Sequence, residues 1–216
     1  MCIRDRFYDI SRTLFASMAV GPGDTSFELQ PTGSIAKGDI VNVTTLTLSA
    51  HTGTHVDAPY HFTEEGQTME QVDPAVYWGL AQVVTVSRES GSLVPGDFAG
   101  YDLGRAPRLL VKSNASAADP RLFHTEFVYP GPELADYLGT LGIVLYGADG
   151  PSMDEPNSRT LPGHHALQRN HILILEGLDL TDVPDGLYEL VAFPLKILGG
   201  DGSPTRAVLR YITDEP

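Results

Sequence analysis

Residues 51–61 read His51-Thr52-Gly53-Thr54-His55-Val56-Asp57-Ala58-Pro59-Tyr60-His61. The stretch holds three imidazoles and one carboxylate, on His51, His55, His61 and Asp57. Such groups lose solvation when they are buried, and they need partners wherever they cluster. A metal ion supplies such a partner, so this motif predicts a metal site around which the rest of the chain is organised.

The backbone of the motif is predicted to be extended and bent rather than helical. Pro59 lacks an N–H and disfavours α geometry at Ala58, although several of the polar residues are four positions apart. All four polar positions are odd-numbered, so an extended backbone would place them on one face. Gly53 and Pro59 would bend that line, which suits a chain that wraps around an ion.

The apolar runs on either side of the motif predict a strand-rich α/β chain without internal repeats. β-Branched residues over 39–49 predict a strand that delivers the motif at its end. A helix is expected at 132–141, where a proline occupies the first turn, and a short helical stretch is expected to open at His164 and His165, after a polar loop. Further strands are expected at residues 7–11, 81–86, 108–112, 142–147, 171–176, 187–193 and 206–212.

Glu176 ends the apolar run 171–176 and shares strand parity with Ile172 and Ile174. A carboxylate on that face would lie in the core, where it costs roughly several kcal/mol unless it is paired or metal-bound. A solvated strand end explains the pattern about as well, so the parity alone leaves both interpretations open.

Composition limits the kinds of partner. The chain has 216 residues, of which 42% are hydrophobic and 19% charged, and this predicts one globular domain. A formal charge of −14 argues against nucleic-acid and anionic-membrane partners, because both attract basic surfaces. The only cysteine is Cys2, so a metal must be held by His, Asp and Glu. A small-molecule or protein partner is therefore expected.

The chain ends carry two expectations. The sequence has no apolar run of membrane-spanning length and no signal-peptide layout at its start, so a cytoplasmic location is expected. The first six residues, Met1-Cys2-Ile3-Arg4-Asp5-Arg6, fit poorly with the rest of the chain and resemble a translated sequencing-adapter remnant. The domain is accordingly expected to span residues 7–216.

The motif resembles the His-x-Gly-Thr/Ala-His-x-Asp-x-Pro-x-His signature of the cyclase family, whose best-known members are bacterial kynurenine formamidases (arylformamidases). The resemblance runs from about Phe7 to Ile212, and it includes residues 22–24, 41–43, 149–154, 174–178, 195–196 and 202–208. It implies a single-domain, swivelling β/β/α fold with a mixed, barrel-like sheet flanked by helices. It also implies a homodimer or a larger homo-oligomer.

The resemblance assigns roles to single residues. His51, His55 and Asp57 match the ligands of one divalent ion, and Asp57 also bridges to a second ion. His164 and Glu176 are twelve residues apart, as are the remaining ligands in the family, although the adjacent His165 stays an alternative. His61 matches the proton donor and acceptor. One or two ions of zinc, or of manganese, suit such nitrogen and oxygen ligands, and a metal-activated water would be the nucleophile.

The implied activity is that of a metal-dependent amidohydrolase acting on a small-molecule amide. In the preferred version it hydrolyses N-formyl-L-kynurenine to L-kynurenine and formate, a step of tryptophan degradation. No Gly-x-Ser-x-Gly elbow and no nucleotide-binding glycine loop offers another chemistry. Kynurenine formamidases typically carry a tryptophan before Pro-Gly-Asp, where this chain has Gly21. An isatin-type cyclic amide hydrolase, another cyclase-family hydrolase, or a catalytically silent metal- or ligand-binding protein therefore stay alternatives.

Overall fold

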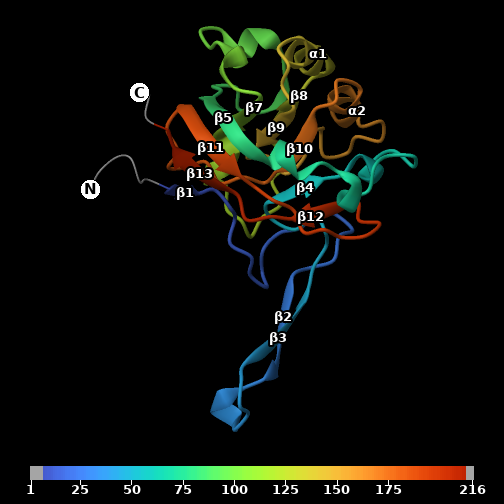
Figure 1. Cartoon of the computed structure of the whole chain (residues 1–216), viewed down its shortest axis with the longest axis vertical. Helices are drawn as coiled ribbons and strands as arrows, with labels where there is room; N and C mark the ends of the chain where they lie inside the picture. Colours follow the sequence, from blue (N-terminus) through green and yellow to red (C-terminus); the bar gives the residue numbers. More distant parts are fainter. Residues whose placement is uncertain (1–6, 213–216) are drawn as a thin grey trace.

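A mixed nine-stranded sheet runs through the computed structural model, which describes residues 7–212 (Figure 1). The strands from β5 to β10 in this sheet are parallel to one another, and the pairs on either side of them are antiparallel. In spatial order the sheet consists of β1 (Phe7–Asp9), β13 (Val208–Tyr211), β11 (Gly186–Val191), β5 (Trp78–Thr85), β7 (Arg108–Lys112), β9 (Leu145–Ala148), β10 (Leu173–Glu176), β4 (His55–Asp57) and β12 (Gly202–Pro204).

Two helices cover one face of the parallel strands (Figure 1). Both α1 (Pro132–Thr140) and α2 (Pro162–Arg169) begin with a proline, whose fixed φ suits the first helical turn. Leu138 of α1 and Leu167 of α2 are fully buried in the same apolar cluster as Ile174 of β10. The predicted α/β fold, with a mixed sheet flanked by helices, is confirmed. Within the described residues, neither helix is long and apolar enough to cross a membrane.

Short elements complete the described part of the chain. The strands β6 (Gly91–Leu93) and β8 (Val128–Pro130) form a small parallel pair. Single 3₁₀ turns lie at Ile35–Lys37, Pro59–His61, Met69–Gln71, Pro74–Tyr77, Pro95–Phe98, Leu103–Arg105 and Asn114–Ala117. The adapter-like residues 1–6 and the chain end at 213–216 lie outside the described residues, so the domain bounds stay a prediction.

The strand predicted over 39–49 forms, but not in the main sheet. It is β3 (Val43–Thr47), which pairs only with β2 (Glu28–Gly33) in an antiparallel hairpin that projects far from the body (Figure 1). All of β3 is exposed, including Val43 and Leu46 at 47% and 54%. This arm is therefore an exposed element with apolar side chains. An isolated two-stranded hairpin of this kind is only marginally stable in water.

The other predicted strands are present: β7 has the predicted bounds, and the remaining ones have ends shifted by a few residues. The helix expected at 132–141 is α1, and α2 begins two residues before His164 because Pro162 starts its first turn. The edge strand β12 was not predicted, since Gly202-Ser203-Pro204 reads as a turn. Pro204 is tolerated there because an edge strand has one side without a partner.

Candidate metal centre

The strand β4 sets two of the motif side chains on one face. It lies between β10 and β12, so that Asp57 is opposite Ile174 and His55 is opposite Glu176. His55, Asp57 and Glu176 are each no more than 3% exposed. The carboxylate of Glu176 is therefore on the core face and beside the motif, and the alternative of a solvated strand end is wrong.

The chain bends on both sides of β4, as predicted at Gly53 and Pro59. Gly53 has φ +69°, and the equally left-handed Gly177 (φ +64°) crosses it so closely that a Cβ on Gly177 would lie 2.3 Å from the Gly53 carbonyl oxygen. Pro59 begins a 3₁₀ turn that ends at His61. These bends bring the ring of His61 back to within 4.0 Å of the ring of His51, measured between centroids.

Two histidines point a ring nitrogen at the carboxylates. His55 donates from Nδ1 to the Gly53 carbonyl (3.0 Å), which leaves its Nε2 lone pair 3.2 Å from Glu176 and 3.5 Å from Asp57. His164 donates from Nδ1 to Asp154 (2.6 Å), and its Nε2 lies 3.5 Å from Asp57 and 3.6 Å from Glu176. We assign these tautomers from the fixed Nδ1 partners.

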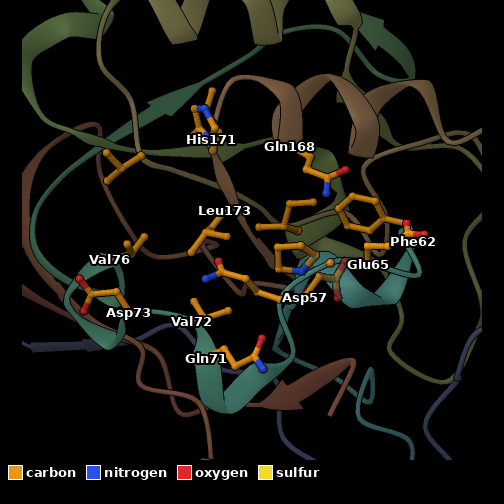
Figure 2. Close-up of a pocket in the computed structure, with 16 residues that line it drawn as sticks. Asp57, Phe62, Glu65, Gln71, Val72, Asp73, Val76, Gln168, His171 and Leu173 are labelled. Carbon is orange, nitrogen blue, oxygen red and sulfur yellow. The ribbon is translucent and has the colours of Figure 1, made fainter. Parts of the chain in front are cut away.

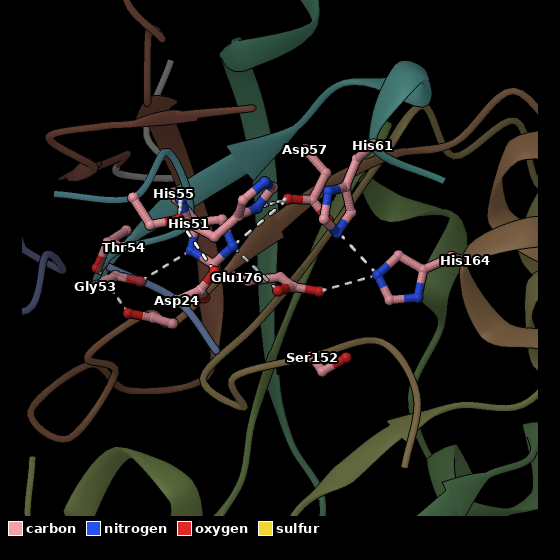
Figure 3. A network of polar contacts seen from close by, with 12 residues as sticks. Asp24, His51, Gly53, Thr54, His55, Asp57, His61, Ser152, His164 and Glu176 are labelled. Carbon is pink, nitrogen blue, oxygen red and sulfur yellow. Dashed lines mark hydrogen bonds and ion pairs between the residues drawn. The ribbon is translucent and has the colours of Figure 1, made fainter. Parts of the chain in front are cut away.

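This arrangement fits a divalent cation. Asp57 Oδ2 and Glu176 Oε1 are buried and have no hydrogen-bond partner among the described residues. In the neutral tautomers each facing Nε2 adds a lone pair, so either a cation or added protons must balance these oxygens. Buried oxygens in this state are costly unless a cation lies between them. Two sets of residues each have donor atoms within 4.8 Å of one another, and Asp57 belongs to both sets (Figure 3). One set is His51, His55 and Asp57, and the other is Asp57, His164 and Glu176.

Without an ion, the cluster balances its carboxylates with protons. Burial alone would lower the pKa of His51, but its contacts with Asp57 and Asp201 outweigh burial and raise that pKa to about 9. The pKa of His164 is likewise raised well above its usual value, against the effect of burial, by Asp154, Asp57 and Glu176. Burial would raise the pKa of Asp57, yet His164 and His51 hold it well below its usual value. The carboxylates of this site therefore attract positive charge.

Asp201 also belongs to the cluster, although nothing in the sequence predicted it. Its Oδ2 lies 3.1 Å from His51 Nε2 and 3.6 Å from His61 Nδ1, and its side chain is 46% exposed. It is 150 positions away from His51, and Asp-Gly is typical of a turn, so no local signal marked it. Only the pairing of β12 with β4 brings Asp201 to the motif.

The remaining site candidates differ in position. His164 faces the carboxylates, whereas His165 is exposed on α2 and contacts Phe62. Gly21 lies in the loop before β2, and Asp24 of that loop accepts a hydrogen bond from Ser49, two residues before the motif. The role of Gly21 in binding substrate stays a prediction.

A cavity of about 580 Å³ adjoins the cluster, with Asp57 in its wall (Figure 2). Its apolar lining includes Phe62, Val72 and Leu173, and the amides of Gln71 and Gln168 supply polar groups. Volumes of this order are typical of small-molecule sites.

Comparison with known proteins shows the family and the fold. The Cyclase family model matches residues 8–155, which include the motif. A kynurenine formamidase of Salinibacter ruber (strain DSM 13855 / M31) is 41% identical over 209 residues, or 95% of this chain and 98% of the relative. A solved structure described as a potential metal-dependent hydrolase with cyclase activity is 28% identical, with a TM-score of 0.81 over 96% of this chain and 99% of that one. Isatin hydrolase A from Labrenzia aggregata, at 24% identity, shares the fold with a TM-score of 0.81 over 94% and 93%. The chain belongs to the Cyclase family.

Proposed function

We propose that this protein is a metal-dependent amidohydrolase that hydrolyses N-formyl-L-kynurenine to L-kynurenine and formate. The observation that carries the proposal is the convergence of His55 Nε2 and His164 Nε2 on two buried carboxylates, each of which has one oxygen without a hydrogen-bond partner among the described residues. The 41% identity to a kynurenine formamidase over nearly the whole chain supports the choice of substrate.

The proposed ligands are His51, His55, Asp57, His164 and Glu176, for one or two ions of zinc or, alternatively, of manganese. Imidazole nitrogens with carboxylate oxygens are suitable ligands for both metals. A bound divalent ion would supply Lewis acidity toward the amide carbonyl and would lower the pKa of a water nucleophile. The carboxylate of Asp57 belongs to both groups of donors, so it would help to hold both ions if two bind.

His61 is the proposed proton carrier. It lies at the open side of the cluster, with a side chain 34% exposed, whereas the side chains of His55 and His164 are each 4% exposed. An imidazole can accept a proton from the attacking water and donate a proton to the amide nitrogen as the C–N bond breaks. The reaction then releases the amine and formate without a nucleophilic serine or cysteine.

The test is an assay of purified protein on N-formyl-L-kynurenine and on isatin, with metal content measured on the same sample. We expect divalent metal and hydrolysis of the formamide, and a loss of about 10²–10⁴-fold in kcat in His61→Ala. His124→Ala is the matched control, because His124 lies outside the cluster and contacts the Asp119 carbonyl. Hydrolysis of isatin alone would transfer the assignment to cyclic amides, and bound metal without any turnover would favour the catalytically silent protein.

We also propose a homodimer or larger homo-oligomer. Exposed apolar side chains lie both on the β2–β3 arm and on the body, where the rings of Trp78 and Phe193 are 6.4 Å apart and 55% and 46% exposed. In a two-fold dimer the arm of each copy can cover the body of the other, so that both surfaces are buried together. Light scattering should show a dimer or larger for the wild type, and a monomer for Leu29→Glu combined with Leu46→Glu.

The control for that experiment is Thr45→Glu, since Thr45 is next to Leu46 on β3 and points to the other face of the hairpin. A wild-type monomer at the concentrations used for assays would remove this proposal. The cytoplasmic location stays a prediction from the sequence.

A further inference from the structure

We propose that Asp201 is a positioning residue for His61: its carboxylate holds the imidazole through Nδ1 and leaves Nε2 free to carry the proton. This inference rests on the proposed hydrolysis. It concerns Asp201, the residue directly before the edge strand β12, which lies far from the motif in the sequence.

The backbone fixes where Asp201 lies. The Ala58 N–H donates to the Asp201 carbonyl (2.9 Å), and directly afterwards β12 pairs with β4. Gly202 lets this strand pass beside His51, since a Cβ at that position would lie 2.8 Å from His51 Cε1. Asp201 is thus anchored to the residue before the 3₁₀ turn that carries His61. Both partners are held by ordered backbone rather than by chance contact of two surface side chains.

One carboxylate oxygen of Asp201 lies close to the imidazoles of both His51 and His61. Asp201 Oδ2 is 3.1 Å from His51 Nε2 and 3.6 Å from His61 Nδ1, and the two rings are inclined by 38°. The contact with His61 is at ion-pair distance, longer than a hydrogen bond. A negatively charged oxygen there attracts an N–H and repels a lone pair, so the proton of a neutral His61 is favoured on Nδ1 and the lone pair on Nε2. In serine proteases a buried carboxylate selects the tautomer of the catalytic histidine through Nδ1.

The consequence for the reaction is a defined proton path. His61 Nε2 accepts a proton as the water oxygen bonds to the formyl carbon, and the imidazolium that results is stabilised by the ionised Asp201. The same Nε2 then donates that proton to the nitrogen as the C–N bond breaks. Asp201 remains a carboxylate throughout, so it acts only through His61.

The alternative role for Asp201 is that of a metal ligand, because His51, His61 and Asp201 also have donor atoms within 4.8 Å of one another. The two roles differ in what the isosteric variant Asp201→Asn does. A positioning residue leaves the metal content unchanged and lowers kcat, whereas a ligand lowers the metal content itself.

The kinetic experiment uses metal-loaded Asp201→Asn, His61→Ala and the double variant, with N-formyl-L-kynurenine as substrate. We expect kcat of Asp201→Asn to fall about 10- to 1,000-fold, with KM within about twofold. The double variant should be no slower than His61→Ala alone, since two residues that act as a unit are not additive. With a formanilide that carries a 4-nitro group, both single losses should shrink, because its amine leaves with little need of a proton.

Asp182→Asn is the matched control, because Asp182 is an exposed aspartate on the loop between β10 and β11, away from the cluster. It should keep wild-type kinetics. Losses that multiply in the double variant, or metal content that falls in Asp201→Asn, would overturn the positioning role.

A second readout does not depend on turnover. In the zinc-loaded protein, ¹⁵N NMR of the imidazoles should show His61 protonated at Nδ1, and Asp201→Ala should shift that proton toward Nε2. The same His61 tautomer in both proteins would overturn the proposal. If the wild type hydrolyses none of the amides, the proposed function fails, and the tautomer measurement still decides whether Asp201 orients His61.

Discussion

The Nδ1–H of His164 donates a 2.6 Å hydrogen bond to Asp154, ten residues earlier in the chain, and both side chains are buried. Asp154 also accepts hydrogen bonds from the backbone N–H groups of Gly163 and His164, at 2.7 and 3.1 Å. Leu161 precedes the helix in a left-handed conformation and cannot cap it, so this aspartate both satisfies the start of α2 and fixes the tautomer of His164.

Asp154→Ala should therefore weaken the fold and the metal site together. We expect the free energy of unfolding of the metal-free protein to fall by about 1–3 kcal/mol, because buried donors lose their acceptor. Zinc affinity should fall about 10- to 100-fold, because His164 is no longer oriented. Denaturant unfolding and competition with a chelator measure the two effects. Asp136→Ala is the control, since Asp136 pairs with Arg169 and Asn170 on the surface and should change neither by much.

Substitutions of the two adjacent histidines of α2 should have clearly different effects on metal binding. His164→Ala removes a nitrogen that lies 3.5 Å from Asp57, whereas His165→Ala removes an exposed ring. Metal analysis should show a reduced stoichiometry in His164→Ala and the wild-type stoichiometry in His165→Ala. A loss confined to His165→Ala would reverse the assignment.

Metal binding should stabilise the protein more at high pH. In the metal-free protein the pKa of His51 is about 9, above its usual 6.5, so its contribution to stability is complete below about pH 6.5 and is lost as pH rises through 9. A bound ion takes the place of that proton, and its affinity rises over the same window. The difference in Tm between metal-loaded and chelator-treated protein should grow from pH 6.5 to 9. A difference that shrinks over this range would contradict the account.

Gly21→Trp tests whether this loop contributes to substrate binding. A Cβ at Gly21 would lie 2.8 Å from Asp24 Oδ2, which an exposed and flexible side chain can relieve by rotating. A stacked indole is worth about 0.5–1.5 kcal/mol, so KM for N-formyl-L-kynurenine should fall about 2- to 10-fold with kcat unchanged. Gly21→Ala displaces Asp24 in the same way without adding a ring, and it should leave KM as it is. An equal KM in all three proteins would remove Gly21 from the substrate site.

Features that depend on neighbouring residues could be predicted from the sequence. The bends at Gly53 and Pro59 follow from backbone chemistry at those positions, and the bounds of β7 match the apolar run 108–112. The parity of Glu176 indicated a possible place on the core face but left a solvated strand end equally open, and only the structure shows that the side chain is buried. Such inferences need no knowledge of which strands are neighbours.

Features that depend on long-range pairing could not be predicted. The residues of β3 have the composition of a strand, but composition does not say that its only partner is β2 and that the hairpin leaves the body. Asp201 lies beside His51 and His61 only because β12 pairs with β4, although the two strands are far apart in the sequence. The sequence leaves Asp154 open, as a residue that shapes the loop of the site or as a plain turn former, and its contact with His164 depends on the fold.

The most direct test of the central claim is a zinc titration of chelator-treated, folded protein, with hydrolysis of N-formyl-L-kynurenine as the readout. We expect no turnover without metal, and activity that rises with zinc and saturates at one or two equivalents per chain. The variant His55→Ala, which lacks the Nε2 that lies 3.2 Å from Glu176, should fail to reach that activity. Full activity of the metal-free protein would contradict the assignment of this cluster as a metal centre.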